Sequence, residues 1–126
     1  MTLAEYFADI SGRIQALAGV SVERYEEQLL SATRGNLRLR LRFADQALLE
    51  ISEAVLCTAD TLQWLSYRYH YQELSGVVLR YDNAPHHPEV VTHPDHKHIG
   101  DNVVASAHPA IAQLLREVQT WRERQR

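Results

Sequence analysis

Cysteine is almost absent from this chain of 126 residues. Cys57 stands alone, which excludes an internal disulfide and suits a reducing cytoplasm. No run of about 18 apolar residues occurs, so no transmembrane helix is predicted. The first residues also lack a basic stretch followed by an apolar one, so we expect no secretion signal. These absences favour a soluble, cytoplasmic globular protein.

The chain also has no excess of basic residues, since its formal net charge is −3. Lys97 is the only lysine among the thirteen basic residues, and all the others are arginines. The flat guanidinium of arginine binds phosphate in a bidentate manner, which an ammonium group cannot do. The total charge therefore does not indicate a nucleic-acid-binding protein, but it is compatible with a local basic groove.

The two ends of the chain show the apolar spacing of helices. Residues at intervals of three and four between positions 3 and 17 predict a first helix. Thr2 and Glu5 form its expected capping box, and Gly19 its expected end. A second helix is predicted after Pro109, with an apolar stripe of Ile111, Leu114, Leu115 and Val118.

The segments between these helices predict an antiparallel sheet. "LRLRLRF" (37–43) alternates strictly, as a half-buried strand does. "ALLEISEAVL" (47–56) predicts the next strand, and residues 20–36 predict a less regular one that ends in a turn at 34–36. Strands at 62–73 and 77–82 are expected to pair around a Leu-Ser-Gly loop. The prediction is one α+β domain, residues 1–126, with a helix at each end packed on the sheet.

The hairpin of 62–73 and 77–82 has a predicted register. With a loop of three residues Glu73 pairs with Val77, which places His70 opposite Arg80 and Arg68 opposite Asp82. The tyrosines of this hairpin then share the other face with its apolar residues. We interpret the tyrosines as core or interface residues rather than a platform for stacking bases.

The segment "RYDNAPHHPEVVTHPDHKH" (80–98) holds five of the seven histidines and three of the four prolines. It is open to three interpretations: a metal site, acid–base groups that cut a phosphodiester, or a polar loop. Cleavage without a metal needs a base, an acid and cations that hold the phosphate. Histidine titrates near neutral pH, and arginine holds phosphate. All these residue types occur in or beside this segment.

The metal-free interpretation gives each polar residue a role. Arg80, helped by Arg68, holds a phosphate, and Asp82 orients a histidine or Arg68. Asn83 shapes the turn or donates to a phosphate oxygen. The predicted catalytic residues are Asp82, His86, His87, His96 and His98, and the predicted substrate-binding residues are Arg68, His70, Arg80, Asn83 and Lys97.

The rival interpretation is a transition-metal ion. His96 and His98 lie on the same side of an extended segment, and His93 is within reach of the same point. Three imidazoles with an open position suit catalytic zinc or a similar ion. The spacing matches no metal signature derived from chemistry, so no cofactor is our first expectation and an ion at His96 and His98 is the second.

Four strings of the sequence resemble one known family: "YRYHYQ" (67–72), the "LSG" loop, "LRYDNAPHHPE" (79–89) and "HPDHKH" (93–98). They are similar to the TumE family of toxins from toxin–antitoxin systems, and the resemblance covers most of the chain. The usual family form has an aromatic residue where this chain has His93, so the resemblance gives His93 no role.

The resemblance implies a small cytoplasmic toxin that a cognate antitoxin neutralises. Such an antitoxin often carries a helix-turn-helix and is encoded by an adjacent gene. Toxins of this size generally act on RNA or translation, which agrees with the interpretation of the arginines and histidines. We therefore expect an RNA-cleaving toxin with an RNA substrate and no membrane partner, and leave a homodimer open. The alternative is a non-catalytic or metal-stabilised binding protein whose histidine segment is structural.

Overall fold

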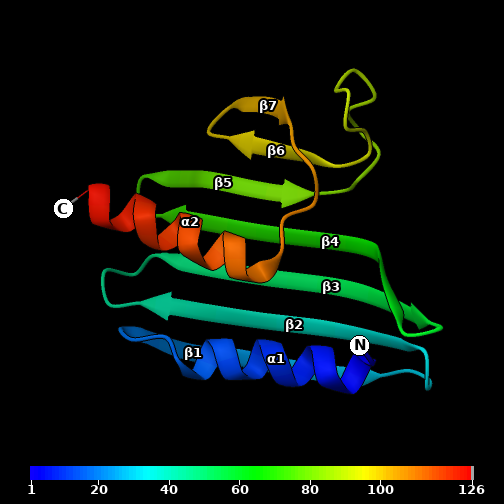
Figure 1. Cartoon of the computed structure of the whole chain (residues 1–126). Coiled ribbons are helices and arrows are strands. Elements are labelled where there is room, and N and C mark those ends of the chain that lie inside the picture. Colours follow the sequence, from blue (N-terminus) through cyan, green and yellow to red (C-terminus); the bar gives the residue numbers. More distant parts are fainter. Residues whose placement is uncertain (126) are drawn as a thin grey trace.

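Seven strands and two helices make up the fold in the computed structural model, which describes residues 1–125. The strands form one sheet in which each strand pairs antiparallel with the next along the chain (Figure 1). The elements are α1 (Leu3–Gln15), β1 (Val20–Leu29), β2 (Arg34–Phe43), β3 (Leu48–Thr58), β4 (Thr61–Glu73), β5 (Gly76–Asp82), β6 (His96–Ile99), β7 (Asn102–Ala105) and α2 (Ile111–Arg124). This arrangement confirms the predicted α+β class.

Both helices lie on the same face of the sheet, α1 over its first strands and α2 over its middle (Figure 1). We call this the helix face and the opposite one the open face. Apolar side chains of β2 and β3 and the tyrosines of β4 fill the space beneath the helices. Tyr69 and Tyr71 are fully buried there, so the tyrosines are core residues, as predicted. No helix within residues 1–125 is long and apolar enough to cross a membrane.

The start of α1 is as predicted, and its end is not. Thr2 Oγ1 accepts a hydrogen bond from the Glu5 backbone, and the Glu5 carboxylate accepts one from the Thr2 backbone. The helix ends at Gln15, before the predicted Gly19. Gly19 instead has a φ of 74° in the connection to β1, a conformation that glycine adopts without strain.

The predicted turn at 34–36 is wrong, because these residues begin β2. The turn lies just before them, where the backbones of Leu30 and Ser31 both donate to the carbonyl of Arg34. Gly35 stands in the strand for a reason of packing. A Cβ at this position would lie 3.1 Å from the ring of Phe7. The missing side chain therefore makes room for α1 and does not serve a turn.

The register of the β4–β5 hairpin is largely as predicted. Arg68 pairs with Asp82, and His70 pairs with Arg80. Glu73 pairs with Gly76 and not with Val77, because the loop is one residue shorter than predicted and a register shift between Tyr71 and Gln72 compensates. The sequence predicted neither β6 nor β7 as a paired strand, although it allowed an extended backbone at 96–98.

Candidate functional site

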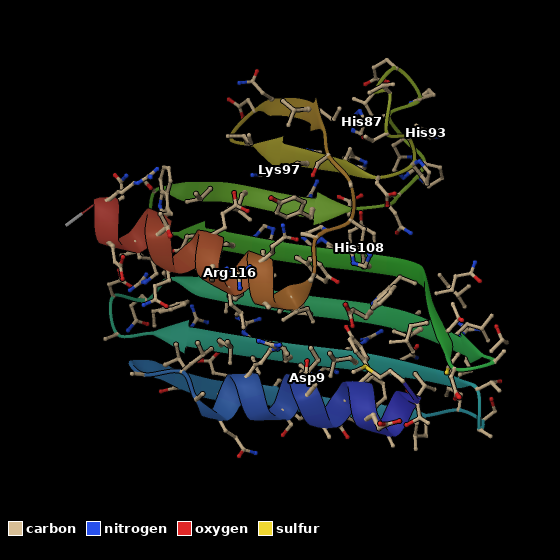
Figure 2. All side chains as sticks on the ribbon, in the orientation of Figure 1. Asp9, His87, His93, Lys97, His108 and Arg116 are labelled. Carbon is tan, nitrogen blue, oxygen red and sulfur yellow. The ribbon has the colours of Figure 1, made fainter. Side chains whose placement is uncertain are left out.

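A pocket of about 440 Å³ lies where β4, β5 and β6 meet the loop 83–95. Strand pairing builds most of it, because β6 pairs with β5 so that His96 lies beside Asp82 and His98 beside Arg80. The loop forms the remaining wall and carries His87 (Figure 2). Eight of the ten predicted site residues line this pocket: Arg68, Arg80, Asp82, Asn83, His86, His87, His96 and His98.

The Asp82 carboxylate is at the centre of the polar contacts. Its Oδ1 lies 3.1 Å from His96 Nε2, and its Oδ2 lies 3.6 Å from His98 Nε2 and 3.3 Å from Arg80 Nε. Oδ1 also accepts the backbone N–H of Ala84. The buried carboxylate thus ties the strand end, the loop and two histidines together.

His96 is held from both sides of its ring. Its Nδ1 lies 2.9 Å from the carbonyl oxygen of Pro94, which can only accept, so Nδ1 carries a proton. Its Nε2 faces Asp82 and also lies 3.1 Å from His98 Nε2. The side chain is only 1% exposed, which leaves no surface for a substrate. His96 therefore lies between Asp82 and His98, within 3.1 Å of each.

His98 is the histidine of β6 that a substrate can reach, because 18% of its side chain is exposed. Burial lowers its pKa, and the nearby Arg80 guanidinium lowers it further. Arg80 Nη2 lies 3.3 Å from His98 Nε2. A neutral imidazole beside a cation is suited to take a proton from a group that the cation holds.

The two arginines of the pocket differ in how many contacts hold their side chains in place. Arg80 is fixed between Asp82 and His98, whereas the Arg68 side chain is exposed at the pocket wall. Arg68 Nη2 lies 3.4 Å from Nδ1 of His70, and the other ring nitrogen of His70 contacts Gln72. His70 is buried, which lowers its pKa, and it does not line the pocket. It supports Arg68 from the side.

Asn83 and Lys97 also have defined positions. The Asn83 carboxamide accepts the backbone N–H of Tyr67 and donates to the carbonyl of Leu65, so it fixes the loop start against β4. Lys97 alternates with the histidines of β6 and points to the helix face, where it pairs with Glu117. The structure does not bring Lys97 to the pocket.

A second arrangement within this pocket concerns metal ions. The ligating nitrogens of His87, His96 and His98 all lie within 4.8 Å of one another. His87 is the third histidine of this cluster in place of the predicted His93, which is exposed on the loop (Figure 2). The bond from His96 Nδ1 to a carbonyl is also a common support for a metal-bound imidazole. The guanidinium of Arg80 beside His98 disfavours a cation at the same point.

Sequence reasoning missed a buried carboxylate on the helix face. Glu53 is 4% exposed and accepts hydrogen bonds from the hydroxyls of Tyr6 and Tyr69 and from Trp64 Nε1. Tyr69 also contacts His108, for which the sequence predicted no role. Burial raises the pKa of Glu53. Glu53 continues the alternation of the apolar residues in its strand, and that position was the available signal.

Comparison of the chain with models of known protein families identifies its family. The model of the family described as Toxin TumE matches residues 5–126, nearly the whole chain. The chain belongs to the TumE toxin family. No curated protein and no solved structure showed a significant match. The match covers all seven strands, α2 and all but the first two residues of α1, and it confirms the resemblance found from the motifs.

Proposed function

We propose that this TumE-family toxin stops growth by cleaving RNA in the pocket at the end of β5. The observation that carries the proposal is the convergence of Arg68, Arg80, Asp82 and His98 from three neighbouring strands. Two guanidiniums offer donors to a phosphate, and a buried carboxylate holds the acid–base groups in place.

The proposed reaction needs only side chains. The imidazole of His98 takes the proton of a ribose 2′-hydroxyl, and the 2′-oxygen attacks the adjacent phosphorus. The bond from phosphorus to the 5′-oxygen breaks, and His86 or His87 on the loop gives that oxygen a proton. Arg68 and Arg80 hold the phosphate oxygens as negative charge builds. The products are a 2′,3′-cyclic phosphate and a free 5′-hydroxyl.

A toxin family implies an antitoxin partner in general. We propose that the antitoxin is a helix-turn-helix protein from an adjacent gene. Induced expression of the toxin alone should arrest growth, because RNA is consumed, and co-expression of the neighbouring gene should restore it. Colony counts with and without the second gene measure this. Arrest that persists when both proteins are made would contradict the proposed partner.

Cleavage in the presence of EDTA tests the reaction itself. We expect a mixed RNA pool to be cut at the same rate with and without chelator, because the proposed proton transfers need no ion. Gel analysis of the fragments and of their 2′,3′-cyclic ends is the measurement. No cleavage under either condition would exclude the proposal, and loss of cleavage with EDTA would exclude its metal-free form.

The cluster of His87, His96 and His98 favours a second candidate, a metal-stabilised binding protein without catalysis. In that case the histidine segment is structural and a bound ion holds the loop against β6. The melting temperature of the purified protein separates the two candidates. A large fall with EDTA, without RNA cleavage, supports the second candidate, whereas an unchanged melting temperature supports the first.

A further inference from the structure

The open face continues from the pocket across the rest of the sheet, because both helices cover the other side (Figure 1). Strand pairing defines which residues share it. One row of neighbours runs Glu26, Arg38, Ser52, Arg68, Asp82 and His96 from β1 to β6. Side chains of directly paired residues point to the same face. The row therefore starts in the pocket and ends at the opposite edge of the sheet.

Positive charge is concentrated on this face although the chain is acidic overall. The arginines that alternation and pairing place there are Arg24, Arg34, Arg38, Arg40, Arg42, Arg68 and Arg80. The carboxylates there are Glu23, Glu26, Glu50 and Asp82. The open face thus carries seven cations and four anions, whereas the rest of the sequence has six cations and twelve anions. Such a separation attracts a polyanion to one face.

Two arginines in the row are free to bind such a ligand. Arg38 and Arg68 are exposed, and neither forms an ion pair with a carboxylate within residues 1–125. Only Ser52 of β3 separates them along the row, and neighbouring strands lie about 4.8 Å apart. Beyond them lies a hollow of about 280 Å³ that only polar residues of β1 and β2 line, Arg38 among them.

Aromatic residues are missing from this face in strands β1 to β7. The strand aromatics point to the helix face: Tyr25, Phe43, Trp64, Tyr67, Tyr69, Tyr71 and Tyr81. Proteins that hold single-stranded nucleic acid by its bases use aromatic side chains for stacking. The open face therefore offers contacts to phosphates but no Phe, Tyr or Trp ring on which a base could stack.

We propose that a single strand of RNA leaving the pocket crosses the open face over β4, β3 and β2, with phosphates held by Arg68 and then Arg38. The inference rests on the proposed action on RNA and extends it. Since the track contacts the backbone alone, it binds RNA of any sequence and leaves the choice of the cut site to the pocket. The long flexible arginines suit successive phosphates along a chain that crosses the strands.

The test is binding of a 2′-O-methyl RNA of about 12 nucleotides, which cannot be cut because it lacks the attacking hydroxyl. Fluorescence anisotropy at several salt concentrations gives the affinity and its salt dependence. Arg38→Gln should weaken binding about threefold to tenfold and reduce the slope of log K against log salt by about 0.7. Arg116→Gln removes the same charge from an exposed position on α2 and should change neither quantity (Figure 2).

An RNA of about three nucleotides adds a second arm, because it fills the pocket and does not reach β2. Arg38→Gln should leave its binding unchanged. Equal losses for Arg38→Gln and Arg116→Gln, or none for either, would overturn the track. So would an Arg38→Gln effect seen only with the antitoxin or an acidic peptide. Failure of the proposed function is distinct, because it appears as intact RNA in the cleavage assay while binding of the uncuttable RNA is measured separately.

Discussion

Replacing His98 with alanine should reduce RNA cleavage by about 10²–10⁴-fold, the usual cost of losing a general base. The imidazole is next to Arg80, which we propose holds the phosphate, and it is the accessible end of the row of contacts from Asp82 through His96. Single-turnover cleavage of a defined RNA gives the rate. Cells that express His98→Ala should form colonies where cells with the wild-type chain do not.

The control for this experiment is His93→Ala, the same change in the loop that precedes β6. The His93 side chain is exposed and does not line the pocket, so cleavage should stay within about twofold of wild type. His98→Gln keeps a polar side chain of similar size without a titrating ring, so it separates loss of the base from loss of folding. Full activity in both His98 variants would remove His98 from the mechanism.

Much of the site could be predicted because its residues lie on strands, where the alternation of side chains and the pairing register decide which residues share a face. Alternation in β4 and β5 fixes which side chains share a face, so Arg68, Asp82 and Arg80 could be placed together from the register alone. The spacing of two between His96 and His98 likewise predicts that their side chains point to the same side of an extended segment. The prediction of Lys97 as a binding residue ignored this rule, since a residue between two pocket residues of a strand must face away.

Other features depend on contacts between segments far apart in the chain. The pairing of β6 with β5 selects His96 as the buried histidine and His98 as the accessible one, and no local pattern distinguishes them. The choice of His87 over His93 depends on how the loop folds back over β6. The local sequence predicts Gly35 as a turn residue, because its packing partner Phe7 lies far away in the chain, on α1.

The second large effect concerns stability. We expect Glu53→Ala to lower the free energy of unfolding by about 3–5 kcal/mol, because it leaves buried donors on Tyr6, Trp64 and Tyr69 without their acceptor. Urea unfolding followed by tryptophan fluorescence measures the change. Glu50→Ala is the matched control, since Glu50 lies on the open face of the same strand and is half-exposed. Its ion pair with Arg40 should contribute less than about 1 kcal/mol.

The pH dependence of Glu53→Gln tests whether the buried carboxyl titrates as its surroundings require. Burial raises its pKa in the folded state above the ordinary value of 4.5, so the folded protein holds the proton more tightly than the unfolded chain does. The stability linked to this proton is fully present below the unfolded pKa and is lost as the pH rises through the folded pKa. An amide cannot titrate, so the free energy of unfolding of wild type relative to Glu53→Gln should fall as the pH rises above the ordinary carboxyl pKa of 4.5. A constant difference at these pH values would show that the hydrogen bonds from Tyr6, Tyr69 and Trp64 cancel the effect of burial, and an increase would show that they exceed it.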